Sequence, residues 1–180
     1  MDTYDQLTAD AYRQGGEASL KLYIKQKVFS FVDRFTIKNE YGADAYSAVG
    51  EFFTIGKKLN VYEGTNTDTL MPVARIEQQL MSFTTRFGII VRGHHVTDMV
   101  RKITLFSNDY KLEGLPWHLD GDFFAHDYCL LDGCNPIMRI SRQWFTWGDS
   151  YELDIADNQD PLLCLSIALA VDCCLCVRKN

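Results

Sequence analysis

Along most of this chain, bulky apolar residues alternate with polar ones over short stretches that turn-forming residues separate. This alternation is typical of half-buried β-strands. It begins near residue 20 and recurs six times, at intervals of roughly 18–27 residues. Most units have a strand that ends in bulky apolar residues, a tight turn, and a second strand in which aromatic and aliphatic residues alternate. The six units begin at Ile24, Val49, Ile76, Ile103, Gly121 and Ile140.

Six units of two strands predict twelve antiparallel strands and no helix between residues 20 and 155. The links between units carry turn-forming sequences at 39–42, 63–66, 92–93 and 132–133. An open meander of this length leaves two unpaired edges, so the pattern favours a closed barrel. A barrel of twelve strands is too wide for its own side chains to fill. Another apolar element must therefore occupy the interior.

The end of the chain supplies such an element. Between residues 162 and 177 only Ser166 and Asp172 are polar, and Asp160 and Pro161 form a good helix start. We expect a central helix at about 160–177, because a helix that is apolar all round lies in a protein core or in lipid. Sixteen residues reach about 24 Å, which is short of the roughly 30 Å hydrocarbon core. The alternative is a peripheral membrane protein that uses this helix.

The helix length also predicts where its polar residue lies. Asp172 is about 18 Å from the helix start, and a tilted seven-residue strand spans roughly the same height. Residues 162–171 should therefore be core, and Asp172 should lie near the far mouth, where water or a polar strand end satisfies it. Residues 173–177 are expected to project beyond the mouth and to need a cover.

Length and composition fit one folded domain. The chain has 180 residues, 47% of them hydrophobic, and a formal net charge of -6. We expect a single barrel domain at 20–180 that follows a polar appendage at 1–19. The negative charge gives no field that attracts nucleic acid. The first 15 residues lack the apolar core of a signal peptide, which favours a cytoplasmic protein that is not transmembrane and has reduced cysteines.

Basic residues form the candidate binding site. Lys25 and Lys27 project from one face of the first strand, while 57–58 and 101–102 bring further cations. Together these side chains predict a basic surface for a phosphate headgroup. The alternative is a solvated barrel exterior, on which lysines prevent edge pairing. The ligand-binding candidates are Lys25, Lys27, Lys57, Lys58, Arg101 and Lys102.

Other chemistry is not indicated by the sequence. Asp154, Asp157 and Asp160 lie in an acidic run, but the run lacks an EF-hand pattern and is explained by the helix dipole. His94, His95, His118 and His126 show no metal-ligand spacing. No nucleophile motif or phosphate loop is present. We expect no catalytic residue, no metal and no cofactor.

The stretches 25–31, 50–53, 142–147 and 154–157 resemble the LURP-one-related family. That family is similar in fold to the tubby C-terminal domain and to phospholipid scramblases, so the resemblance implies a twelve-stranded barrel threaded by an apolar helix. Tubby domains bind phosphoinositides and scramblases act at membranes, whereas LURP-one-related proteins have no settled activity. The resemblance therefore implies a non-enzymatic cytoplasmic binding or scaffold protein. Its expected partner is an anionic phospholipid headgroup or another protein.

Overall fold

The computed structural model describes residues 19–26, 34–51, 55–65, 67, 71–81, 84–103, 108–142 and 150–177. The predicted appendage lies outside these residues except for Ser19, which begins the first strand. The elements are β1 Ser19–Gln26, β2 Arg34–Asn39, β3 Asp44–Gly50, β4 Lys58–Glu63, β5 Ala74–Gln78, β6 Arg86–Val91, β7 His94–Ile103, β8 Asn108–Glu113, β9 Trp117–Asp122, β10 Asp127–Asp132, β11 Asn135–Arg142, β12 Ser150–Ala156 and α2 Pro161–Val177.

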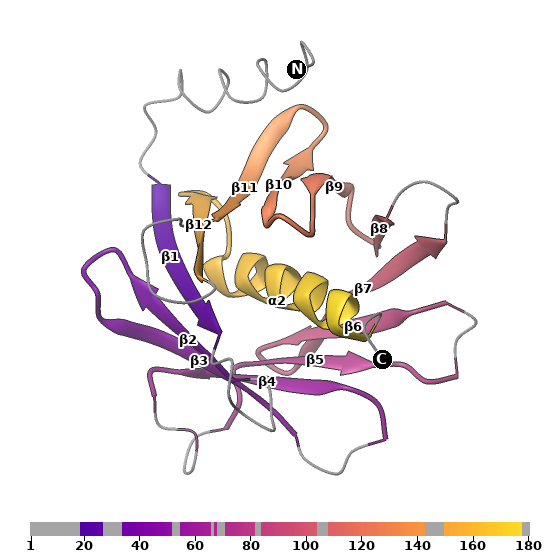
Figure 1. The fold of residues 1–180 in the computed structure, drawn as a ribbon, viewed down its shortest axis with the longest axis horizontal. Coiled ribbons are helices and arrows are strands. Elements are labelled where there is room, and N and C mark those ends of the chain that lie inside the picture. Colours follow the sequence, from indigo (N-terminus) through magenta and orange to yellow (C-terminus); the bar gives the residue numbers. More distant parts are fainter. Residues whose placement is uncertain are drawn as a thin grey trace.

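The strands form a closed antiparallel barrel, in which each strand pairs with its neighbours in sequence and β1 pairs with β12. Figure 1 shows these strands arranged around α2. The predicted twelve-stranded barrel with a central C-terminal helix is confirmed. Each of the six sequence units corresponds to one hairpin, from β1–β2 to β11–β12. Strand β5 ends at Gln78, earlier than the apolar pattern predicted, whereas residues 27–31, into which the pattern extended the first strand, lie outside the described residues.

The interior of the barrel is filled by inward-facing side chains of the strands and by the helix. In β12, for example, Tyr151, Leu153 and Ile155 are buried. On α2, the side chains from Leu162 to Leu175 are buried except that of Leu163. The alternative in which this helix lies in lipid disagrees with its burial inside the barrel. Within the described residues, no helix is long and apolar enough to cross a membrane.

The first turn of α2 is fixed by Asp160. Its Oδ1 accepts hydrogen bonds from the backbone N–H groups of Leu162, at 2.9 Å, and Leu163, at 3.4 Å. Arg92, in the turn between β6 and β7, forms an ion pair with the same carboxylate. Although burial raises the pKa of Asp160, these hydrogen bonds and the Arg92 charge hold it below its usual value. The predicted helix start is confirmed.

The last turns of α2 differ from the prediction. Cys173, Cys174 and Leu175 are 2%, 1% and 9% exposed, so they do not project beyond the barrel. The strand β7 is ten residues long and reaches alongside this part of the helix, where the Sδ atom of Met99 lies 4.0 Å from the Sγ atom of Cys174. The prediction that these residues project was wrong for Cys173–Leu175, because side chains of β7 and of the turn between β9 and β10 lie against the end of the helix.

Candidate anion-binding mouth of the barrel

The two ends of the barrel are defined by the direction of α2. Consecutive strands are antiparallel, so all odd-numbered strands run in one direction and all even-numbered strands in the other. The last residue of α2 lies at the side of the barrel where odd-numbered strands finish and even-numbered strands start. Tyr151, near the start of β12, contacts Asp172 late in the helix, whereas Arg92 contacts Asp160 at its start. We call these two ends the C-terminal mouth and the N-terminal mouth.

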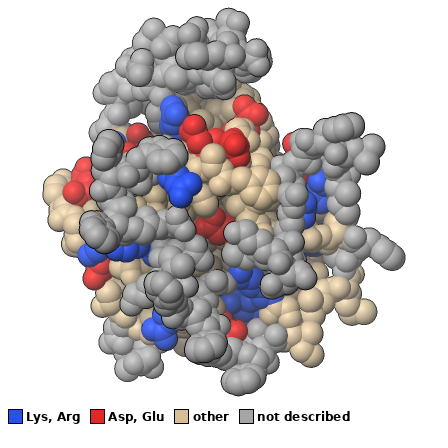
Figure 2. All heavy atoms as spheres, viewed as in Figure 1, with Lys and Arg blue, Asp and Glu red and all other residues tan. Residues whose placement is uncertain are grey.

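The basic candidates that the structure describes all lie at the C-terminal mouth. Lys25 is near the end of β1, Lys57 and Lys58 are at the start of β4, and Arg101 and Lys102 are near the end of β7. We call these five residues the basic rim. Lys27 lies outside the described residues. In Figure 2, one patch of Lys and Arg side chains lies below and to the right of the centre, and other patches are spread over the same face.

Two members of the basic rim face the barrel interior. Arg101 lies two positions after the buried Met99 and opposite the buried Tyr110, and its Nε atom is buried. Lys57 lies two positions before the buried Leu59. Burial raises the pKa of the Cys174 thiol to about 12, and the positive charges of Arg101 and Lys57 oppose this rise. The two cations therefore converge on the end of α2.

The outward members differ in their partners. The Nζ atom of Lys58 lies 4.0 Å from Glu77 on β5, in a half-exposed ion pair. Lys25 and Lys102 are exposed. Because two strands separate β1 from β4, and two more separate β4 from β7, the rim covers an arc of the mouth and is not a single small pocket. Such an arc suits several anionic groups in one plane.

Asp172 lies at this mouth and is 7% exposed. Its Oδ2 atom accepts a hydrogen bond from the Tyr151 hydroxyl, and its Oδ1 atom lies 3.0 Å from His126 Nε2. The His126 ring also stacks on Tyr151, with ring centroids 4.6 Å apart. Burial, and then the Asp172 charge, raise the pKa of Tyr151 well above its usual value, so the hydroxyl stays protonated and donates. The prediction that a polar strand end satisfies Asp172 is confirmed.

The β9–β10 turn brings His126 to Asp172. Asp122 Oδ1 accepts the backbone N–H groups of Phe124 and Ala125, at 2.9 and 3.0 Å, which fixes the turn. His126 then adopts a left-handed backbone conformation with φ of 54°. The Phe123 ring of the same turn is buried, with its centroid 5.0 Å from that of Tyr128. The repeat predicted a turn in this unit, but not that the turn would lie over the end of the helix.

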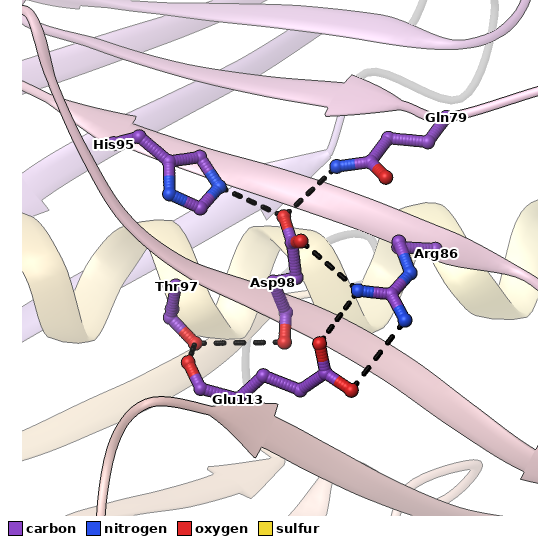
Figure 3. A network of polar contacts seen from close by, with 6 residues as sticks. All are labelled: Gln79, Arg86, His95, Thr97, Asp98 and Glu113. Carbon is purple, nitrogen blue, oxygen red and sulfur yellow. Dashed lines mark hydrogen bonds and ion pairs between the residues drawn. The ribbon is translucent and has the colours of Figure 1, made fainter.

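A second polar cluster is centred on the outer face of β6, β7 and β8, with Gln79 after β5 and the buried Thr97 at its margins, and Figure 3 shows its members. Arg86 donates to Asp98 at 3.0 Å and to Glu113 at 2.6 Å. Asp98 also accepts from Gln79 at 2.9 Å and lies 2.8 Å from His95 Nε2. The outer cluster comprises Gln79, Arg86, His95, Thr97, Asp98 and Glu113.

The outer cluster is best explained by strand pairing. Arg86, Asp98 and Glu113 come from three adjacent strands, and Asp98 is paired with Glu113 in the register of β7 and β8. The arginine separates two carboxylates that would otherwise repel each other. Since each polar atom that Figure 3 joins already has a partner within the cluster, we assign it a role in stability.

The remaining candidates are spread over the barrel. Asp157 and Asp160 lie beyond β12 at the N-terminal mouth, and His118 is exposed on β9. Among the residues that the structure describes, no three His, Cys, Asp or Glu side chains are grouped as a metal site would require. Cys129, Cys134, Cys164, Cys173 and Cys174 are free thiols.

A closed twelve-stranded barrel around a C-terminal apolar helix defines the tubby-like class of fold. The family model described as LURP-one-related matches residues 20–172, and the chain belongs to this family. It is 35% identical over 153 residues to a Bacillus subtilis (strain 168) protein described as uncharacterized protein YxjI, with 85% of this chain and 92% of the relative covered. The X-ray structure of a protein from Arabidopsis thaliana has a TM-score of 0.59 at 10% identity, with 87% of this chain and 91% of that chain covered, which is a likeness of fold.

Proposed function

We propose that this protein is a non-enzymatic binding protein that recognises anionic phospholipid headgroups at its C-terminal mouth. The observation that carries the proposal is the position of the basic rim. Lys25, Lys57–Lys58 and Arg101–Lys102 are far apart in the sequence, yet strand order places them at one end of the barrel. A basic arc is the kind of surface that attracts the headgroups of an anionic leaflet.

Electrostatics within the mouth also support the proposal. The last carbonyl groups of a helix carry partial negative charge. Lys57 and Arg101 therefore neutralise the negative end of α2 in addition to attracting an anionic ligand. Lys25 and Lys102 have no such internal role, because they are exposed on the outer side. We therefore assign the headgroup contacts mainly to the outward lysines and give the inward pair a role in holding the mouth positive.

A cytoplasmic location is part of the proposal, because the cytoplasmic leaflet of a cell membrane is the anionic one. Fractionation of cells that express the full chain would find it in the cytosol and on the inner membrane surface, and removable by salt. Recovery outside the cell would contradict this location.

The test is vesicle flotation at low salt. Full-length protein should float with phosphatidylcholine vesicles that contain about 30% phosphatidylserine, and should stay behind with phosphatidylcholine alone. Binding should fall steeply between about 20 and about 300 mM salt, because exposed charges are screened over this range. The variant Lys58→Glu/Lys102→Glu should bind at least about 25-fold more weakly, since each lysine near such a surface contributes about fivefold.

The matched control is Lys38→Glu/Lys111→Glu, which makes the same change in net charge. Lys38 is exposed at the N-terminal mouth and Lys111 is exposed on the outer wall of β8. This control should bind as the wild type does. If both double variants lose affinity equally, net charge and not the basic rim governs binding. If the wild type does not bind anionic vesicles at all, the proposal is wrong and a protein partner becomes the better candidate.

A further inference from the structure

Three large apolar side chains are exposed where β4 begins and β5 ends, at the C-terminal mouth. Ile55 precedes β4, and Leu80 and Met81 follow β5. Their exposed fractions are 85%, 51% and 104%. A single exposed apolar residue is ordinary, but several in one place mark a contact surface. We call these three residues the apolar edge.

The apolar edge is contiguous although its residues come from two connections. The backbone N–H of Gln78 donates to the carbonyl of Lys57 at 2.8 Å, and the backbone N–H of Lys57 donates to the side chain of Gln78 at 3.0 Å. A Cβ atom on Gly56 would lie 3.1 Å from Leu80 Cδ2. The segment that carries Ile55 therefore lies against the segment that carries Leu80 and Met81.

Cations flank the apolar edge on both sides. Lys57 and Lys58 follow Ile55 closely in the chain. On the other side, the backbone N–H of Arg101 donates to the carbonyl of Thr85 at 2.9 Å, which joins the end of β7 to the connection that carries Met81. Lys57 and Lys58 therefore adjoin the apolar edge, and the β7 part of the basic rim lies against the connection between β5 and β6.

Other exposed apolar residues have different surroundings. Met71 and Tyr41 are each 85% exposed, but they lie at the N-terminal mouth. That mouth also carries the exposed carboxylates of Glu40, Asp44, Glu63 and Asp157. Phe124 is 49% exposed at the C-terminal mouth, beside the exposed Asp122 and Asp127. These residues therefore provide internal comparisons for the apolar edge.

We propose that Ile55, Leu80 and Met81 insert into the surface of an anionic phospholipid bilayer while the flanking cations contact its headgroups. This inference rests on the function proposed above and adds an orientation, with the C-terminal mouth facing the bilayer. Membrane-surface binding strengthens with both buried apolar area and attraction to anionic lipids. The protruding aliphatic side chains supply the buried apolar area, and the adjacent lysines supply the attraction to anionic lipids.

The shape of the edge favours a bilayer over a protein partner. Met81 and Ile55 are exposed almost completely, so they protrude and do not line a concavity. A protein partner would need preformed pockets to bury such side chains, whereas acyl chains rearrange around them. The hot spots of protein interfaces are enriched in Tyr, Trp and Arg, and the apolar edge contains none of these side chains.

The experiment compares two methionines of the full-length protein in the flotation assay. Met81→Asp should weaken binding to vesicles with about 30% phosphatidylserine by at least about tenfold, since it places a charge where an apolar group is buried. Met71→Asp makes the same change at the opposite mouth and should bind as the wild type does. In a second measurement, Met81→Trp fluorescence should be quenched by lipids with brominated acyl chains, and Met71→Trp fluorescence should gain no comparable quenching.

The outcomes separate this inference from the function on which it rests. If Lys58→Glu/Lys102→Glu loses binding while Met81→Asp does not, and Met81→Trp is not quenched, insertion is overturned and headgroup recognition stands. If Met81→Asp loses binding while the lysine variant does not, insertion stands and recognition by the basic rim is overturned. Absence of wild-type binding overturns both. Equal loss in Met81→Asp and Met71→Asp also overturns insertion, because position then has no effect.

Discussion

The Nε2 atom of His126 lies 3.0 Å from Oδ1 of Asp172, although the two residues are 46 positions apart. Together with the Tyr151 hydroxyl, this contact satisfies the carboxylate at the end of the apolar helix. A carboxylate with so little exposure would be strongly destabilising without such partners. The contact therefore links the β9–β10 turn, β12 and α2 at the C-terminal mouth.

The bond between Tyr151 and Asp172 can be measured by a double-mutant cycle. We expect Asp172→Ala to lower the free energy of unfolding by about 2–4 kcal/mol and Tyr151→Phe by about 1–2 kcal/mol. The double variant should lose less than the sum of the single losses, because the two groups are in direct contact. Urea unfolding measures all three. Ser166→Ala removes the other buried polar side chain of α2, which donates to the Leu162 carbonyl at 2.7 Å, and should cost less than Asp172→Ala. Strict additivity would rule out the direct bond.

The carboxylate of Asp160 should make stability depend on acid pH. Its folded pKa is lower than the value near 3.9 of an unfolded chain, so ionised Asp160 stabilises the fold above that pH. This contribution is lost as the pH falls through the lower, folded pKa. Asp160→Asn should cost below about 1 kcal/mol at neutral pH, since the group is partly exposed, and should weaken the acid dependence. Asp157→Asn, at an exposed position, is the control. If the loss of stability at acid pH is identical in the two variants, the assignment of this loss to Asp160 is wrong.

Thiol labelling should report how well the barrel shields the cysteines of α2 from solvent. Cys134 is exposed in the β10–β11 turn, whereas Cys164 and Cys174 are buried with pKa values raised to about 12 by burial. At pH 8 roughly one buried thiol in ten thousand would be ionised, and the thiolate is the reactive form. Mass spectrometry after brief alkylation should find Cys134 modified and the two buried residues unmodified until urea is added. Native labelling of Cys174 as fast as that of Cys134 would mean that the mouth is open.

Gly121 should be intolerant of a side chain. Its φ is 125°, and an added Cβ atom would lie 2.6 Å from the Asp127 carbonyl oxygen and 2.7 Å from Tyr128 Cα. We expect Gly121→Ala to cost more than about 2 kcal/mol, since backbone must move as well as adopt a disfavoured angle. Gly133→Ala is the matched control, because φ is 58° there but no atom lies within 4 Å of the added Cβ. It should cost about 1 kcal/mol. Thermal unfolding compares the two, and equal losses would contradict the predicted backbone clash.

The outer cluster should affect stability without affecting binding. Asp98→Ala removes the acceptor that Arg86, Gln79 and His95 share, so we expect a loss of about 1–3 kcal/mol in the free energy of unfolding. Vesicle binding by the folded variant should equal that of the wild type. A selective loss of vesicle binding at unchanged stability would assign the cluster to a binding site instead.

Much of the architecture follows from local patterns. Alternation within each unit marks which side chains face inward, and six units give six hairpins. The apolar stretch after Asp160 and Pro161 has the length and small side chains of a helix inside such a barrel. The same pattern predicts the burial of Leu162, Leu165 and Leu169, which are at most 2% exposed. The candidate lysines were also visible in the sequence, but only as separate pairs.

Local patterns in the chain therefore account for the strand count, the closed barrel, the helix that fills it and a position near one mouth for Asp172. Four relationships depend on the folded chain: His126 and Tyr151 meet that carboxylate, Lys57 and Arg101 converge on the end of α2, Cys173–Leu175 stay buried, and Gly56, next to Ile55, lies against Leu80. The difference arises because alternation and helix length are local properties of the chain. The stagger of a closed barrel, and the strand ends that it brings to each helix turn, depend on all twelve strands together.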